Sequence, residues 1–76
     1  MTLDLLPLGQ EAVITAVGGA GALRLRLLDM GLIPKITVRV EKIAPLGDPI
    51  ELRVRGYALS LRKEDARNIH VEVKQV

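Results

Sequence analysis

Hydrophobic and polar residues alternate with a period of two over most of this chain. The alternation is clearest over residues 36–41 and again over residues 50–55. Because successive side chains of a strand point to opposite faces of a sheet, this pattern predicts strands with one packed face and one wet face. Residues 10–17 alternate less sharply, with apolar residues on both faces, as in a strand that is covered on two sides. Five strands are predicted: residues 10–17, 36–43, 50–55, 57–61 and 69–73.

Residues 22–30 break this alternation and predict a helix between the first two strands. They are rich in Leu and Arg and contain no β-branched residue, which favours a helix, although part of the segment also alternates with period two and leaves a strand as the rival interpretation. Gly31 suits the left-handed position that follows a last helical turn. The helix is therefore expected to end near Met30, with Leu32 packing against Leu27 as in a Schellman ending.

The predicted helix is apolar on two opposite sides. At 100° per residue, Leu23, Leu27 and Met30 fall in one sector, whereas Leu25 and Leu28 fall on the far side. The first side is expected to enter the core, and the second is expected to dock on another protein. The alternative is that Leu25 and Leu28 are covered within this chain, by the N-terminal leucines or by the glycine-rich loop before the helix. The residues predicted to contact a partner are Arg24, Leu25, Arg26, Leu28 and Asp29.

Turn residues separate the later strands and define the fold class. Residues 44–49 hold two prolines and a glycine, which predicts an antiparallel hairpin between the flanking strands, and Gly56 permits a second sharp bend. A break in the alternation near Lys42 predicts a β-bulge, and the polar residues 62–68 predict one helical turn. The fold class is therefore mainly β: a small, partly open SH3-like five-stranded barrel with a short helix after the first strand, with an OB-like barrel as the alternative. Residues 1–76 are expected to form a single domain.

The composition restricts the chemistry of the core and the compartment. Hydrophobic residues make up 49% of the chain, but there is one Tyr and no Phe or Trp, so the core must be built from aliphatic side chains. The absence of cysteine excludes disulfides, thiolate metal sites and thiol nucleophiles, and it suits a reducing cytosol. No segment has the features of a signal peptide or the roughly 20 apolar residues of a membrane-spanning helix, and a cytoplasmic location is expected.

Charged residues give little sign of a catalytic, metal or nucleic-acid site. Eleven basic and nine acidic residues are scattered along the chain for a net charge of +2, whereas nucleic-acid binders usually carry a clustered basic face. His70 is the only histidine, and no other ligand accompanies it at a metal-binding spacing. No nucleophile has a candidate base beside it. We expect no metal, no cofactor and no enzymatic activity.

Three segments of the chain resemble the bacterial ferrous iron transport protein A (FeoA) family. They are residues 26–34 (RLLDMGLIP), 44–50 (APLGDPI) and 55–62 (RGYALSLR), in the family's order and with similar spacing. The resemblance implies an SH3-like barrel and a cytosolic accessory role beside FeoB, the Fe²⁺ transporter that carries a GTPase domain. Two positions depart from the family pattern. Lys35 stands where many relatives have Gly, which implies a stiffer loop, and Leu25 stands where a basic or polar residue is common.

The sequence and the resemblance together give one leading functional hypothesis. The chain is expected to be a non-enzymatic adaptor that binds the cytoplasmic, GTPase-containing part of FeoB and modulates it, meeting the membrane only through that partner. A small nucleic-acid-binding barrel is the alternative, although nucleic acid is not the expected partner. Weak self-association through the same helix leucines is a third possibility.

Overall fold

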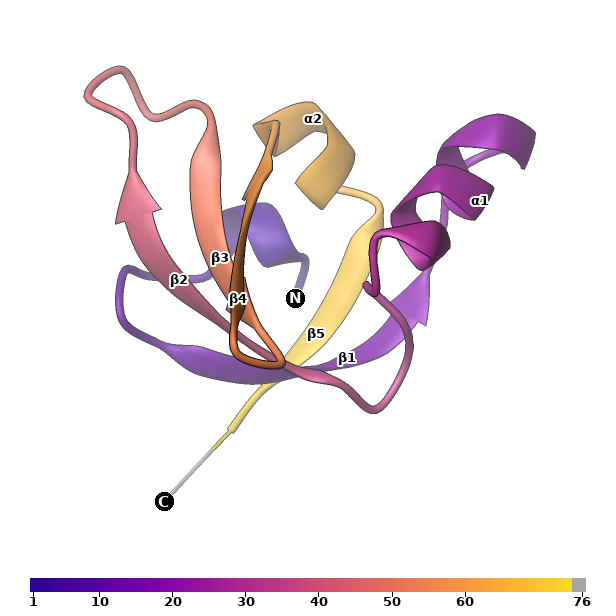
Figure 1. The fold of residues 1–76 in the computed structure, drawn as a ribbon, viewed down its shortest axis with the longest axis horizontal. Helices are drawn as coiled ribbons and strands as arrows, with labels where there is room; N and C mark the ends of the chain where they lie inside the picture. Colours follow the sequence, from indigo (N-terminus) through magenta and orange to yellow (C-terminus); the bar gives the residue numbers. More distant parts are fainter. Residues whose placement is uncertain (75–76) are drawn as a thin grey trace.

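The strands form one strongly curved antiparallel sheet in the computed structural model, which describes residues 1–74 (Figure 1). The elements are, in chain order, the 3₁₀ helix η1 (Leu3–Leu5), β1 (Glu11–Val17), α1 (Gly21–Asp29), β2 (Thr37–Ile43), β3 (Ile50–Val54), β4 (Tyr57–Leu61), α2 (Lys63–Ala66) and β5 (Ile69–Val73). The strand order is β4-β3-β2-β1-β5, so β4 and β5 are the two edges of an open sheet. The predicted mainly β, partly open SH3-like architecture is confirmed.

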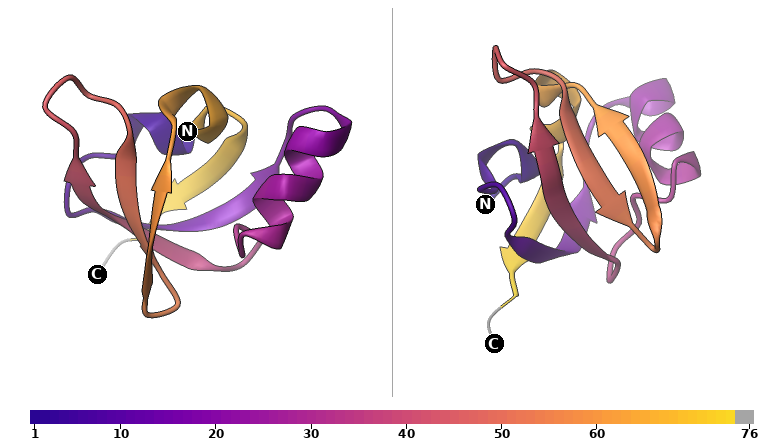
Figure 2. Two further views of the ribbon diagram at one scale, coloured as in Figure 1. Left: turned by 45° about the horizontal axis from the view of Figure 1, so that its top comes forward. Right: turned by 60° about the vertical axis from the view of Figure 1, so that its left-hand side comes forward.

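The three helices take different places around this sheet. η1 and α2 lie side by side at one end of the curved sheet, near the N-terminus (Figure 2). α1 follows β1 and stands apart from the other two helices, beyond the end of that strand (Figures 1 and 2). This arrangement leaves one side of α1 free of contact with the sheet.

The concave side of the sheet holds an aliphatic core, as the composition predicts. Within residues 1–74 no polar or charged side chain is buried, and no buried side-chain nitrogen or oxygen lacks a hydrogen-bond partner. The buried residues are Leu3, Leu6, Ala12, Ile14, Val17, Leu27, Leu32, Val38, Val40, Ile50, Leu52, Val54, Leu61, Ala66, Ile69 and Val71. The fold is held by apolar burial, with hydrogen bonding left to the backbone and the surface.

A β-bulge interrupts β2 where the sequence predicts one. The pairing of β2 with β3 shifts register between Val40 and Lys42, so Ile43 faces Ile50 as its cross-strand partner. The bulge does not bury Ile43, which keeps 42% of its surface exposed at the end of β2 although its partner Ile50 is buried. A second register shift, between β1 and β5, has no counterpart in the sequence prediction.

The hairpin between β3 and β4 turns within two residues. Val54 pairs with Tyr57, and the intervening Arg55 and Gly56 have φ values of 48° and 86°. Positive φ at both central positions is the signature of a type I′ turn, whose twist matches that of the flanking strands. The sequence locates the bend at Gly56, but nothing local predicts a left-handed Arg55.

Both ends of α2 are satisfied by side chains from nearby loops. The Lys63 backbone N–H donates to Asp48 Oδ1 at 3.0 Å, so this aspartate of the β2–β3 loop caps α2 besides serving as a turn residue. Asn68 does not end this helical turn in a left-handed conformation, since its φ is not positive. Instead, the Asn68 side-chain amide donates to the carbonyl oxygens of Glu64 and Asp65 at 3.2 and 3.4 Å.

Candidate functional site

The C-terminal end of α1 is closed by the motif that the sequence predicts. Gly31 has a φ of 93°, its N–H donates to the Leu28 carbonyl at 3.0 Å, and the Leu32 N–H donates to the Leu27 carbonyl at 3.2 Å. These two bonds define a Schellman ending. Leu27 and Leu32 are both fully buried, so the end of the helix is anchored in the core.

The end of α1 is also tied to the edge of the sheet. The Tyr57 hydroxyl, at the start of β4, donates to the Met30 carbonyl oxygen at 2.5 Å. A Cβ atom at position 31 would collide with that hydroxyl, so Gly31 provides room for the contact as well as a left-handed conformation. The sequence analysis missed this bond. The one available signal was that Tyr57 is the only aromatic residue of the chain.

α1 buries one side and exposes the other. Leu27 lies in the core, and Leu23 and Met30 pack beside it half-buried. Leu25 is displaced from Leu27 by about 160° around the helix and keeps 61% of its surface exposed. The alternative, that this chain's own loops cover Leu25, is therefore wrong.

The prediction that Leu25 and Leu28 both lie on the solvent side of α1 is wrong for Leu28. Leu28 is half-buried and packs against the core cluster, because its position on the flank of α1 still faces the rest of the domain. Leu25 is thus the apolar centre of the exposed face, and Leu28 lies at its margin.

The charged residues of the predicted site lie around Leu25 and are partly held in place. Arg24 donates from Nε to the Val17 carbonyl at the end of β1 at 3.1 Å. Arg26 forms an ion pair from Nη2 to Asp65 Oδ2 of α2 at 3.1 Å. Asp29 is exposed and, within the described part of the chain, forms no ion pair. The five predicted residues thus occupy one helix, with four on its surface and Leu28 half-buried.

An open cleft adjoins this helix, and the sequence did not predict it. It has a volume of about 460 Å³ and lies between α1, β4 and α2. Met30 and Leu61 contribute apolar surface, and Arg26, Ser60, Arg62 and Asp65 supply polar groups. Its lining comes from three elements that are far apart in the chain, which is why a local pattern could not reveal it.

The described residues offer no metal centre. Within residues 1–74 there is no group of three or more His, Asp or Glu side chains placed to hold a metal ion, and His70 is exposed on β5. Over the same residues, no helix has the length and apolarity needed to cross a membrane.

Comparison with known proteins identifies the family. A family model described as the FeoA domain matches residues 1–73. The chain belongs to the FeoA family. This family takes part in ferrous iron transport, so the resemblance noted from the three sequence segments is confirmed.

The relatives agree in sequence and in fold. The chain is 45% identical over 73 residues to the Fe(2+) transport protein A/Fe(2+) transporter FeoB fusion protein of Porphyromonas gingivalis; the match covers 96% of this chain but spans only 9% of the fusion protein. The FeoA-like protein of Clostridium acetobutylicum is 36% identical, with a TM-score of 0.92 over 100% of this chain and 88% of that one. Stenotrophomonas maltophilia FeoA, solved with zinc and described as a procaryotic SH3 domain protein, is 30% identical, with a TM-score of 0.84 over 95% of this chain and 89% of that one.

Proposed function

We propose that this FeoA-family protein is a non-enzymatic accessory factor that binds the cytoplasmic, GTPase-containing region of FeoB through the outer face of α1. The supporting observation is Leu25: an apolar side chain that is 61% exposed on a helix whose C-terminal end is fixed by the core and by Tyr57. Support for the partner comes from the Porphyromonas gingivalis relative, in which a FeoA region and FeoB belong to one polypeptide.

The anchoring of α1 favours recognition by a preformed surface. Leu27 and Leu32 hold one end of the helix in the core, while Arg24 and Arg26 link it to β1 and to α2. A helix that is already ordered loses little conformational freedom when a partner binds, so more of the contact energy remains as affinity. The flanking Arg24, Arg26 and Asp29 carry both signs of charge and would orient the partner.

The size of the apolar contact predicts a weak complex. Complete burial of one leucine contributes about 1.5–3 kcal/mol, whereas association costs at least about 4 kcal/mol. Additional surface must therefore take part, and the cleft between α1, β4 and α2 is the adjacent candidate. A covalent link between two binding partners raises the effective concentration of one at the other to about the millimolar range, so that even a weak contact forms. The fused relative has such a link.

A binding experiment with two exposed leucines tests the proposal. Leu46 is 97% exposed at the tip of the β2–β3 loop and provides a control for Leu25. The purified cytoplasmic domain of FeoB, with and without guanine nucleotide, is titrated with the wild-type chain, Leu25→Asp and Leu46→Asp by calorimetry. We expect wild type and Leu46→Asp to bind alike and Leu25→Asp to bind at least about tenfold more weakly, a loss of about 1.4 kcal/mol.

Circular dichroism and light scattering complete this test. Both variants should keep the wild-type spectrum, because neither leucine belongs to the core. Light scattering separates binding of FeoB from self-association through the same leucine. If the wild-type chain binds neither the cytoplasmic domain nor the intact transporter, or if Leu25→Asp binds like wild type, the proposal fails.

A further inference from the structure

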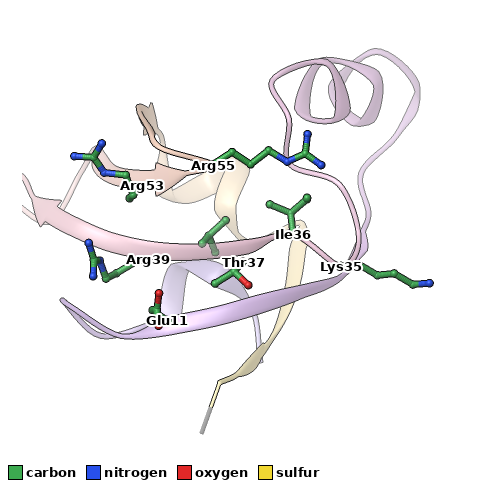
Figure 3. A pocket seen from close by; sticks show the side chains of 8 residues that line it. Glu11, Lys35, Ile36, Thr37, Arg39, Arg53 and Arg55 are labelled. Atoms are coloured by element: carbon green, nitrogen blue, oxygen red, sulfur yellow. The ribbon is translucent and has the colours of Figure 1, made fainter. Parts of the chain in front are cut away.

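A second recess lies on the other side of the sheet from the core and is basic. It has a volume of about 320 Å³ and uses no residue of α1. Figure 3 shows Arg39, Arg53 and Arg55 around it, with Glu11 at its lower margin and Ile36 between Arg55 and β1. Lys35 belongs to its rim, with the ammonium group directed outward (Figure 3).

The net charge of the whole chain is concentrated at this recess. Four of the eleven basic residues line it, and two of the nine acidic residues, Glu11 and Glu41, lie against them. The local charge of +2 equals the formal net charge of the chain. The scattered charges of the sequence thus become a basic site only after the strands pair.

The positions of two of these arginines are unfavourable for the stability of the sheet. Arg39 of β2 and Arg53 of β3 are direct cross-strand partners, and like charges directly opposite each other destabilise a sheet. Glu41 Oε1 bridges them, at 2.8 Å from Arg39 Nη2 and 3.3 Å from Arg53 Nε. One carboxylate oxygen of Glu41 therefore accepts hydrogen bonds from both guanidinium groups.

Donors remain available beside this internal carboxylate. Within residues 1–74, Arg55 and Lys35 make no ion pair, and Arg55 extends over the recess in Figure 3. The planar guanidinium fork binds carboxylates in a bidentate manner, which an ammonium group cannot do. Three arginines around one hollow thus offer more donors than Glu41 alone uses.

We propose that this recess binds carboxylate side chains of an acidic segment of a protein, and that Arg39, Arg53 and Arg55 are the residues that bind them. A bilayer surface is disfavoured because it cannot enter a hollow and because the most exposed leucines, Leu46 and Leu5, lie outside the lining. Single-stranded nucleic acid is disfavoured because the lining contains no aromatic residue for base stacking. The site is independent of the proposed α1 contact.

A titration with hexaglutamate, followed by ¹H–¹⁵N NMR of the full chain, tests this proposal. We expect saturable shifts of the backbone amides of residues 35–39 and 53–55. The shifts should be lost near 1 M salt, where the Debye length is about 3 Å. The double variant Arg39→Gln/Arg55→Gln should bind at least about tenfold more weakly, because two charge-assisted hydrogen-bonding groups are removed.

A matched variant controls for net charge. Arg62→Gln/Arg67→Gln removes two exposed arginines that do not line the recess and should bind hexaglutamate within about twofold of wild type. If the double variant Arg39→Gln/Arg55→Gln does not fold, the single variant Arg55→Gln is titrated with hexaglutamate in its place. The proposal is overturned by the absence of saturable shifts, by equal weakening in the control, or by preferential binding of phosphatidylglycerol vesicles or of a single-stranded oligonucleotide.

Discussion

The Tyr57 hydroxyl donates a hydrogen bond to the Met30 carbonyl oxygen, and this bond joins the edge of the sheet to the end of the exposed helix. Met30 is the C-cap of α1, where the last carbonyl groups of a helix have no partner within the helix itself. The bond therefore satisfies a helix end and fixes α1 against β4 at the same time. A local pattern can locate the helix end, but only the fold supplies the tyrosine.

Removal of this hydroxyl should weaken the domain without unfolding it. Tyr57→Phe keeps the ring and loses one hydrogen bond, for a loss of about 1 kcal/mol in the free energy of unfolding. Urea denaturation measures it, and the midpoint should fall without a change in slope. A wild-type midpoint in Tyr57→Phe would show that the bond contributes nothing to stability.

Gly31 and Tyr57 should be coupled in a double-mutant cycle. Gly31→Ala introduces a methyl group that meets the Tyr57 hydroxyl, and it also forces Ala into a left-handed conformation at φ 93°. The left-handed strain alone costs about 1 kcal/mol, and the collision adds to it. In a Tyr57→Phe background the collision disappears, so Gly31→Ala should cost less there. Additive effects would contradict this account.

The two sides of α1 should respond very differently to truncation. Leu27→Ala opens a cavity in the core and should cost about 2–5 kcal/mol, a large part of the stability of a chain of this length. Leu25→Ala removes an exposed side chain and should change stability by no more than about 0.5 kcal/mol. Chemical denaturation of both variants provides the comparison. Similar losses in the two would mean that Leu25 is packed against the domain.

Asp48 should stabilise α2 through its carboxylate oxygen. Asp48→Ala leaves the Lys63 N–H without its acceptor and should cost about 1 kcal/mol. Asp48→Asn retains an oxygen that accepts the same bond and should remain near wild type, since Asn and Asp are equally good caps. Equal losses in the two variants would assign the effect to the charge of Asp48.

Glu41 should titrate below its ordinary range. The hydrogen bond from Arg39 lowers the pKa of Glu41 below 4.5, and a second bond from Arg53 adds to this effect. The unfolded chain then binds protons more readily at this position, so the stabilisation is complete above about pH 4.5 and is lost as the pH falls through the lowered pKa. NMR titration of the Glu41 carboxyl measures it, and Arg39→Gln should raise the pKa. A pKa of 4.5 or more in the wild-type chain would contradict the bridging geometry.

Lys35 should be a strained position. Its φ is 77°, in the left-handed region that glycine enters without penalty. Lys35→Gly removes strain of about 1–2 kcal/mol and adds an entropic cost of about 0.5–1 kcal/mol, so the variant should be more stable by up to about 1.5 kcal/mol. Thr37→Gly, in the extended β2, should instead be less stable by about 0.5–1 kcal/mol. Thermal denaturation of the pair provides the test, and a loss of stability in both would show that Lys35 is unstrained.

The sequence alone determined the features that depend on short stretches of chain. The period-two alternation located the strands, the break near Lys42 located the bulge, and Gly31 located the helix end with its Leu27–Leu32 contact. These signals are local because strand pleat, helical repeat and left-handed glycine each act within a few residues.

Only the tertiary structure decided which side chains are exposed and which of them lie together on the surface. In the folded chain Leu28 is half-buried, and the Tyr57 hydroxyl reaches the Met30 carbonyl oxygen. Strand pairing also brings three arginines around one recess: Arg39, Arg53 and Arg55. Each of these outcomes depends on segments that are distant in sequence and adjacent only after the sheet has formed. The alternation of a strand fixes which face a side chain takes, but strand pairing and sheet curvature fix its neighbours.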